Sequence, residues 1–310
     1  MRERWMMVGV GGAVVVALTL GFWAGTRTHG AKPSIVPPPL PLAATIGSAK
    51  SARPATAPAK PAPAPAVSTD ASSNSTARTL LTTADHAVAH EQWLEARGTY
   101  QQILQEYPTS AEAIQAQQRL GDINIHLLLT PSPMPDAPFY QDYTVELGDT
   151  LGKIARQHRT TVELLRVVNH IPHDKILVGR PLRVPRVTFS VIVDKSQNTL
   201  TLKANEEVIK VYTVSTGRED QTPVGTFTIV NRLVDPPWYT ARGIIPPGSP
   251  ENILGTRWMG FSKPSYGIHG TTDASTIGQS VTAGCVRMRN EDVEELYTFL
   301  PIGTDVTIVG

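Results

Sequence analysis

YGIHGTTDASTIGQSVTAGCVRMRNED, residues 266–292, is the stretch from which the rest of the chain is interpreted. It contains Cys285, the single cysteine of the 310 residues, together with His269. A thiol is a good nucleophile only as the thiolate, and a nearby imidazole can remove its proton. Because the chain has eight histidines, a structural cysteine with an unrelated histidine is the competing interpretation. The two residues alone leave both interpretations open.

The residues around this pair form a longer and more specific motif. A His-Gly-Thr segment precedes a loop of small residues, and Thr-x-Gly-Cys-Val-Arg-Met follows before an acidic helix start. This string resembles the signature of the L,D-transpeptidase catalytic family. Its members in this chain are His269, Gly270, Thr271, Thr282, Gly284, Cys285, Val286, Arg287 and Met288.

The resemblance implies a role for each part of the motif. Cys285 is the expected nucleophile and His269 its general base, which the carbonyl of Gly270 orients without a carboxylate partner. Backbone N–H groups near Gly284 and Cys285 are expected to stabilise the oxyanion, because glycine lets a substrate carbonyl approach closely. The expected oxyanion and substrate-binding residues are Gly284, Thr282, Arg287 and Tyr266.

The roles of two positions in the motif, Arg287 and Ala283, stay open. Arg287 either attracts a substrate carboxylate and lowers the thiol pKa, or pins the loop structurally. Many family members have histidine immediately before the Gly-Cys pair, where this chain has Ala283. Any role assigned to that position is therefore in doubt, although His269 is intact.

Residues 187–310 have the period-two pattern of β-strands, in runs such as FSVIVD and TLTLKA. We expect a mainly-β domain of mostly antiparallel strands, a sandwich or an open barrel, and the resemblance implies the L,D-transpeptidase fold. One helix is expected to start at Asn290 as its N-cap. The segment 233–251 is predicted to form a flap beside the substrate cleft, or else to pack its aromatic side chains on the sheet. The expected buried residues of the helix are Val293, Leu296, Tyr297 and Leu300.

Residues 143–186 alternate as a strand, two helices and a strand. Thr150 is the predicted cap of the first helix, and Thr160 with Glu163 the predicted capping box of the second. The string Y-x-V-x-x-GDTL-x-x-IA resembles a LysM domain, which implies a βααβ fold that binds N-acetylglucosamine-containing glycans such as peptidoglycan. Helix capping alone is the alternative for the polar residues of this set. The implied glycan-binding residues are Gly148, Asp149, Thr150, Leu151, Asn169 and Ile171, with His170 between the last two.

Residues 77–130 show three apolar stripes at helical spacing. Ala96, Tyr100 and Pro108 resemble part of one tetratricopeptide repeat, and a small helical hairpin that acts as a spacer or binds a protein partner is the alternative. Residues 31–76 are rich in Pro and Ala and predict a disordered, extended linker. A second linker is expected over residues 131–142.

Residues 1–30 contain an uncharged apolar run that follows Arg2 and Arg4 and has Trp5 and Trp23 near its ends. This pattern predicts a signal anchor that crosses the membrane as one helix, with the rest of the chain exported. A cleaved secretory signal is the alternative. The predicted location is the bacterial cell envelope, with the catalytic domain in the periplasm or cell wall.

The composition narrows the classes of partner. A formal net charge of +1 gives no basic surface for nucleic acid. A single cysteine excludes an intrachain disulfide and leaves the thiol free for chemistry. No histidine spacing indicates a metal site, and no cofactor is expected.

Together these features predict an anchored enzyme that acts on the wall. As implied by the resemblance, Cys285 forms a thioester with a donor stem peptide, D-alanine leaves, and the acyl group passes to an amine of a second stem peptide or of a protein. The alternatives are an L,D-carboxypeptidase or thiol hydrolase on the same stem peptides, and a non-enzymatic wall-binding scaffold, which Ala283 would favour.

Overall fold

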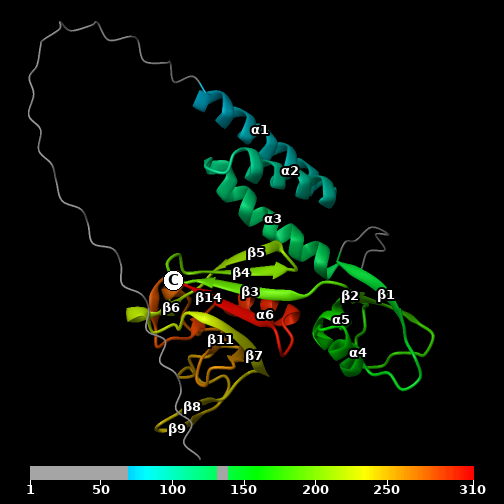
Figure 1. Ribbon diagram of the computed structural model, residues 1–310, viewed down its shortest axis with the longest axis vertical. Helices are drawn as coiled ribbons and strands as arrows, with labels where there is room; N and C mark the ends of the chain where they lie inside the picture. The colour runs from blue at the N-terminus through cyan, green and yellow to red at the C-terminus, as the bar shows by residue number, and fades with distance from the viewer. Residues whose placement is uncertain (1–68, 131–138) are drawn as a thin grey trace, which may run out of the picture. The chain divides into compact units, whose positions relative to one another are not determined.

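The computed structural model describes residues 69–130 and 139–310 (Figure 1). The anchor expected over residues 1–30 lies outside the described residues, as do most of both linkers. Within the described ranges, no helix is long and apolar enough to cross a membrane. All described residues belong to one compact unit of the chain.

Three helices form the first described part of the chain, as the apolar stripes predict. They are α1 Thr69–Ala89, α2 Trp93–Glu106 and α3 Ala111–Leu129. Ser110 caps α3, because its Oγ accepts a hydrogen bond from Ala113 N at 3.1 Å. The core between the helices includes Leu81, Ala84, Ala96, Tyr100, Ile103, Ala113, Ala116 and Ile123.

The next unit has the predicted βααβ order. It consists of β1 Tyr140–Thr144, α4 Leu151–Gln157, α5 Val162–Val168 and β2 Pro181–Pro185, with β1 and β2 antiparallel. Thr150 caps α4 as predicted, since its side chain accepts from Lys153 N.

The capping box predicted from Thr160 is wrong by one residue. Thr161 is the N-cap of α5 and accepts from Leu164 N at 2.9 Å. The hydroxyl of Thr160 is buried and finds no hydrogen-bond partner. Two adjacent threonines offer the same local signal, and a distant contact distinguishes them, because Thr161 also donates to the carbonyl of Thr298.

The catalytic part of the chain is mainly β, as expected, and its strands form one curled sheet of eight. The order across the sheet is β13-β11-β10-β7-β14-β3-β4-β5. The pairs β11–β13 and β3–β14 are parallel and the other neighbours are antiparallel. The strands are β3 Phe189–Asp194, β4 Thr199–Ala204, β5 Glu207–Thr213, β7 Gly225–Val234, β10 Arg257–Phe261, β11 Gly267–His269, β13 Val286–Arg287 and β14 Asp305–Val309.

Short elements connect these strands. Two further pairs are β6 Thr216–Gly217 with β12 Ser280–Thr282, and β8 Trp238–Thr240 with β9 Gly243–Ile245. Two single-turn 3₁₀ helices, η1 Arg218–Asp220 and η2 Ala274–Thr276, lie before β7 and before β12.

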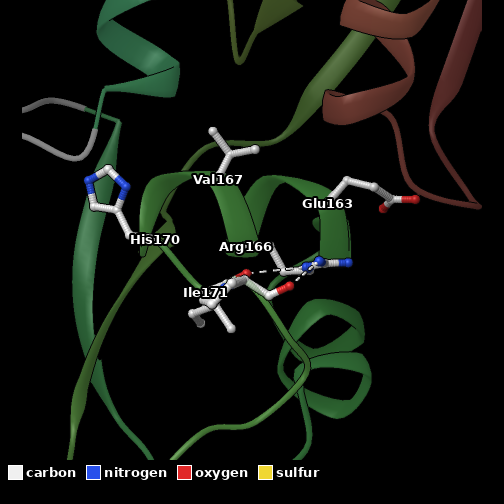
Figure 2. Close-up of a pocket in the computed structure, with 6 residues that line it drawn as sticks. Glu163, Arg166, Val167, His170 and Ile171 are labelled. Atoms are coloured by element: carbon white, nitrogen blue, oxygen red, sulfur yellow. Dashed lines mark hydrogen bonds between the residues drawn. The ribbon is translucent and has the colours of Figure 1, made fainter.

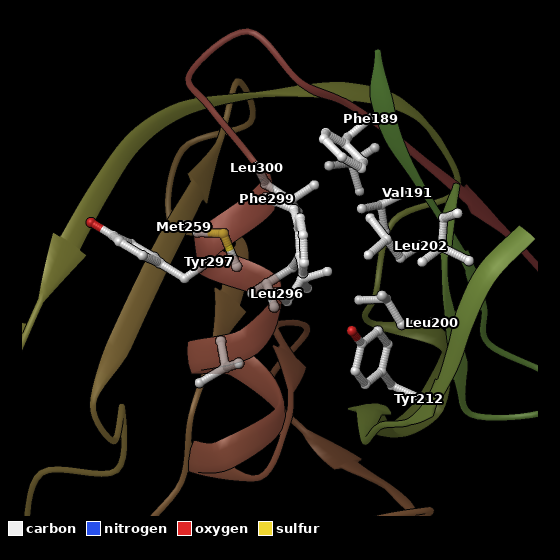
Figure 3. Close-up of a cluster of buried hydrophobic side chains, with 14 of the residues drawn as sticks. Phe189, Val191, Leu200, Leu202, Tyr212, Met259, Leu296, Tyr297, Phe299 and Leu300 are labelled. Carbon is white, nitrogen blue, oxygen red and sulfur yellow. The ribbon is translucent and has the colours of Figure 1, made fainter. Parts of the chain in front are cut away.

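Helix α6, Asn290–Phe299, lies within the curl of the sheet and supplies much of the core (Figure 3). All four residues predicted to be buried are buried, and Phe299 joins them at 0% exposure. Phe299 lies against Phe189, with ring centroids 5.3 Å apart. This packing holds the end of α6 against β3.

The prediction that Asn290 caps α6 is wrong. Arg289 is the N-cap and makes no side-chain capping bond, while Asn290 is the first helical residue. The Asn290 side chain turns away from the helix and accepts hydrogen bonds from two distant backbone amides, those of Thr256 and Thr271. Two tertiary bonds therefore replace the single capping bond that the local sequence favours.

Both upstream parts pack on the sheet domain. Leu128 of α3 and Leu164 and Val168 of α5 lie in the same hydrophobic cluster as the strand residues. Asn124 of α3 is fully buried and donates to the carbonyl of Ile209 in β5 at 2.9 Å. Helix α3 thus covers the edge strand β5, whose free edge would otherwise be open to pairing.

Candidate active site

His269 is the last residue of β11, and Cys285 directly precedes the neighbouring strand β13 at one edge of the sheet. Strand β11 pairs in parallel with β13, so that Ile268 lies opposite Val286. These two side chains are fully buried in the core. His269 lies opposite Arg287, and strand alternation places both on the other face together with Cys285.

The imidazole of His269 is buried and held from several sides. Its Nδ1 lies 2.6 Å from the carbonyl oxygen of Gly270. The indole of Trp258, opposite it on β10, stacks on the ring with centroids 6.0 Å apart. Because a carbonyl only accepts, Nδ1 carries the proton and Nε2 is left as the free base. The carbonyl of Gly270 thus holds the imidazole in one orientation, and its role in catalysis stays a prediction.

Burial sets the charge of this imidazole. It lowers the pKa of His269 to about 4, with a smaller opposing effect from the Gly270 hydrogen bond and a further lowering by the charge of Arg287. At neutral pH the ring is uncharged and able to take a proton.

The depressed pKa of His269 predicts a pH-dependent stability. An imidazole in water has an ordinary pKa of 6.5, whereas the pKa of His269 in the folded protein is about 4, so below pH 6.5 the unfolded chain binds the proton better. Above pH 6.5 the protonation of His269 takes nothing from the stability of the folded protein. As the pH falls to about 4, we expect the free energy of unfolding to decrease by about 3 kcal/mol. Denaturant unfolding at pH 7 and pH 4 measures this loss. In His269→Gln the loss should be smaller by that amount, and an equal loss in both proteins would contradict the burial of a neutral imidazole.

The thiol of Cys285 is also uncharged at rest. Burial raises its pKa, while a backbone hydrogen bond from Gly267 and the charge of Arg287 act in the opposite direction. The Sγ atom lies 3.6 Å from the carbonyl oxygen of Ser265. The pair is thus a neutral thiol and a neutral imidazole, which suits proton removal during attack rather than a preformed ion pair.

The turn before Cys285 is held by two threonines. Thr282 Oγ1 donates to the carbonyl of Cys285 at 2.6 Å and accepts from Gly284 N at 3.1 Å. Thr222 Oγ1 donates to the carbonyl of Gly284 at 2.9 Å and accepts from Gly217 N at 2.7 Å. The side chain of Thr222 is fully buried.

These bonds distinguish the two amides expected to stabilise an oxyanion. The N–H of Gly284 is already engaged by Thr282. For the N–H of Cys285, the described part of the chain offers no hydrogen-bond acceptor. Because a peptide group is planar, the bond from Thr222 to the Gly284 carbonyl points the N–H of Cys285 the opposite way. Cys285 N–H is the amide that remains available to a substrate oxygen.

Gly284 is required by its conformation and by its neighbours. Its φ of +121° is one that side chains rarely adopt. A Cβ there would lie 2.6 Å from Cε1 of Tyr266 and 2.8 Å from the carbonyl oxygen of Gln221. Tyr266 therefore packs directly over the turn, and Ala283 beside it is exposed.

Arg287 is tied to the loop that precedes β12. Its Nη1 donates to Thr276 Oγ1 at 3.0 Å, and its backbone exchanges two hydrogen bonds with Ser215. Its buried Nε has no partner. The contact with Thr276 supports the interpretation of Arg287 as a structural pin, while its charge acts on both His269 and Cys285.

The segment predicted as a flap forms the hairpin of β8 and β9. Asn252 closes the base of this hairpin, since its Nδ2 donates to the carbonyls of Pro236 and Pro246 at 2.8 and 3.2 Å. Tyr239 in the middle of β8 is 71% exposed and so does not pack on the sheet, whereas the neighbouring Trp238 is half-buried.

The residues implied as glycan contacts in the LysM-like unit are largely occupied by internal bonds. The carboxylate of Asp149 accepts from Tyr143, Glu146 N and Lys153, and the Tyr143 bond, followed by Lys153, lowers its pKa to about 2. Asn169 makes three side-chain bonds, to the carbonyls of Leu165 and Arg183 and from Arg183 N.

The other residues implied as glycan contacts differ in their exposure to solvent. Leu151 is 2% exposed in the core, whereas Gly148 and Thr150 are on the surface. The polar side chains Asp149 and Asn169 therefore hold the two loops in shape, which leaves backbone groups and neighbouring side chains for contact with a glycan.

A surface pocket of about 650 Å³ lies beside the loop after α5 (Figure 2). Arg166 holds this loop, with its guanidinium donating to the carbonyls of Ile171 and Pro172 at 3.3 and 2.7 Å. Of the residues implied as glycan contacts, Ile171 therefore lines this pocket, whereas those of the loop before α4 do not. The lining consists of Glu163, Arg166, Val167, His170, Ile171 and Pro172.

A thiol on the same face of the sheet as a neutral imidazole, with a backbone N–H left without an acceptor among the described residues, is the arrangement that the class of cysteine acyl-transfer enzymes requires. Comparison with known proteins specifies the class further. The family model of the L,D-transpeptidase catalytic domain matches residues 188–308, and the LysM domain model matches residues 143–185.

Three proteins illustrate the similarity. YkuD of Bacillus subtilis (strain 168), which carries the name of an L,D-transpeptidase, is 36% identical over 173 residues, 54% of this chain and 97% of that protein. YqjB of the same organism, similarly named, is 40% identical over 124 residues, 38% of this chain and 69% of that protein. A crystal structure of an L,D-transpeptidase from Mycobacterium tuberculosis aligns over 44% of this chain and 75% of that chain, with 17% identity and a TM-score of 0.35.

The similarity to YkuD extends over nearly the whole of that protein. This chain belongs to the L,D-transpeptidase family, and the protein is an L,D-transpeptidase.

Proposed function

We propose that the protein crosslinks peptidoglycan by way of a thioester on Cys285. The observation that carries the proposal is the commitment of His269 Nδ1 to the Gly270 carbonyl, which leaves Nε2 as a neutral base on the face of the sheet that carries Cys285. Such a pair can activate a thiol without a carboxylate.

The first half of the reaction acylates the enzyme. Cys285 Sγ attacks the carbonyl carbon that links the third residue of a donor stem peptide, an L-centre, to the fourth, a D-alanine. The thiol proton passes to His269 Nε2, and the developing oxyanion receives a hydrogen bond from Cys285 N–H. The carbon–nitrogen bond breaks, the proton moves from His269 to the leaving amine, and D-alanine departs.

The second half transfers the acyl group. The amine of an acceptor, from another stem peptide or from a protein, attacks the thioester carbonyl and gives a proton to His269. The carbon–sulfur bond breaks, and the proton returns to the sulfur of Cys285. If water replaces the amine, the same steps release a tripeptide and the enzyme acts as a carboxypeptidase.

The proposed location is the bacterial cell envelope, with the LysM domain bound to glycan strands. Residues 1–30 are the proposed membrane anchor, and residues 31–76 the proposed tether, whose last residues from Thr69 onward belong to α1. The sequence supports both, through the apolar run flanked by Arg2 and Trp23 and through the Pro/Ala-rich composition that follows. Helices α1 to α3 are a proposed docking surface for a protein partner.

Product analysis tests the function directly. The full-length chain is incubated with disaccharide tetrapeptides, and the products are followed by mass spectrometry. Crosslinked dimers together with free D-alanine are the expected result. Tripeptide without dimers would indicate hydrolysis instead of transfer, and the absence of any product that depends on Cys285 would contradict the proposed chemistry.

A further inference from the structure

The side chain of Asn290 reaches from the start of α6 to the loop that follows His269. Its Oδ1 accepts a hydrogen bond from Thr271 N at 3.1 Å and another from Thr256 N at 3.2 Å. One oxygen thus joins three segments that are far apart in the sequence: the start of α6, the residue after Gly270, and the start of β10.

The first of these bonds acts on the peptide group that orients the catalytic imidazole. The carbonyl of Gly270 and the N–H of Thr271 belong to the same peptide group, which is planar. Its oxygen lies 2.6 Å from His269 Nδ1, and its N–H donates to Asn290. Rotation of this group would break both bonds together. Holding the N–H end therefore fixes the direction in which the carbonyl meets the imidazole.

Asn290 Oδ1 is closely surrounded. A Cβ built on Gly270 would lie 2.2 Å from this oxygen, and one built on Gly255 would lie 2.3 Å from it. Both positions are glycine, so the amide oxygen occupies space that two side chains would otherwise fill. Gly255 also has a φ of +64°, which glycine adopts without strain. The position of the oxygen is set by packing as well as by its hydrogen bonds.

The same bond also strengthens the Gly270 carbonyl as an acceptor. Hydrogen bonds in a chain polarise one another, so a bond to the N–H of a peptide group increases the negative charge on its oxygen. A stronger acceptor keeps the proton of His269 on Nδ1 and leaves Nε2 more basic. Orientation and basicity of the imidazole thus depend on the same side chain.

We propose that Asn290 is a positioning residue for catalysis, which aligns His269 through the peptide group between Gly270 and Thr271. The inference rests on the proposed role of His269 as general base. Asn290 does not contact the substrate or the reacting atoms in this proposal. It acts by keeping the imidazole in the tautomer and orientation that removal of the thiol proton requires.

Substitution of Asn290 in the full-length chain tests the inference with two readouts. Asn290→Ala should lower kcat for acyl transfer by about 100-fold with little change in KM, as expected for a misplaced catalytic group. Asn290→Asp keeps an oxygen in the same place, at a helix start that favours negative charge, and should stay within about tenfold of the wild type. The downfield proton resonance of the imidazole Nδ1–H, assigned by its absence in His269→Gln, should persist in Asn290→Asp and move upfield in Asn290→Ala.

A matched control separates positioning from folding. Asn124 is also an asparagine that links distant segments, with bonds from Arg97 at 2.8 Å and to the Ile209 carbonyl at 2.9 Å. Asn124→Ala should lower stability while leaving the imidazole resonance and kcat unchanged. Wild-type kcat and an unmoved resonance in Asn290→Ala would overturn the inference, as would loss of the resonance in a folded Asn290→Asp. Should Asn290→Ala fail to fold, Asn290→Asp decides alone. The resonance reports on His269 without turnover, so the inference can fail while the proposed function stands.

Discussion

Replacing Cys285 with alanine is expected to abolish acyl transfer, with a loss in kcat on the order of 10⁶-fold. Without the thiol no thioester can form, and no other cysteine exists in the 310 residues to replace it. His269 alone has no nucleophile to activate, so the two residues act as a unit. Release of D-alanine from a tetrapeptide donor measures this effect.

The stability of the Cys285→Ala protein serves as the control. The sulfur lies 3.6 Å from the backbone oxygen of Ser265, which is too long for a strong hydrogen bond, and also interacts with the backbone of Gly267. We expect the free energy of unfolding to change by less than about 1 kcal/mol. A folded Cys285→Ala protein that retains a substantial part of the transfer rate would exclude the thiol mechanism.

Replacing Thr222 with valine is expected to have the second largest effect, an approximately 100- to 1000-fold loss of acyl transfer. Valine has the shape of threonine but cannot donate to the Gly284 carbonyl, so the N–H of Cys285 is no longer held toward the oxyanion. Two buried backbone groups, Gly217 N–H and Gly284 C=O, also lose their partner. The free energy of unfolding should fall by about 2 to 4 kcal/mol.

Alkylation of Cys285 by iodoacetamide distinguishes this effect from a general disturbance of the site. Alkylation displaces iodide and forms no oxyanion, so Thr222→Val should slow acylation by the donor while leaving alkylation nearly unchanged. Thr222→Ser keeps the hydroxyl and should retain acyl transfer. Equal losses of alkylation and acylation in Thr222→Val would show that the threonine only maintains the fold.

Replacing Thr160 with valine is the same chemical change as Thr222→Val, but we expect the opposite effect on stability. Its hydroxyl is buried, with no hydrogen-bond partner among the described residues. Thr160→Val should therefore be neutral or stabilising, by about 1 kcal/mol at most, and should leave transfer unchanged. The contrast with Thr222→Val shows that the hydrogen bonds, and not the removal of a hydroxyl, carry the effect.

The sequence is sufficient for the elements whose signals are local. The period-two runs identify β3, β4, β5, β7 and β14, whereas β10, β11 and β13 lie outside them. The apolar stripes identify α1 to α3, and the buried face of α6 is predicted correctly because helical spacing decides it. Thr150 is predicted as a cap for the same reason, since a cap bonds to an amide only three residues away.

The parts that the sequence does not predict depend on contacts between distant segments. Asn290 has every local property of an N-cap, yet its oxygen bonds to Thr256 and Thr271. Thr222 lies in a recognisable TP-x-G-x-F element, but its bond to Gly284 spans 62 positions. Neither partner can be read from a single sequence without the arrangement of the sheet.

The expected oxyanion donors illustrate the same limit. The glycine before Cys285 indicates a tight turn, and the turn is present with Gly284 at a φ of +121°. The direction of each N–H in the turn depends on which side chain holds it. Thr282 occupies the amide of Gly284, and only the structure shows that the amide of Cys285 is the one left over.

The most direct test of the central claim is the intact mass of the full-length protein after brief incubation with a tetrapeptide donor and an acid quench. The thioester on Cys285 predicts a mass increase equal to the donor minus D-alanine, lost again on addition of an acceptor amine and absent in Cys285→Ala. Release of D-alanine without any such adduct, or an adduct of the same mass on the Cys285→Ala protein, would contradict it.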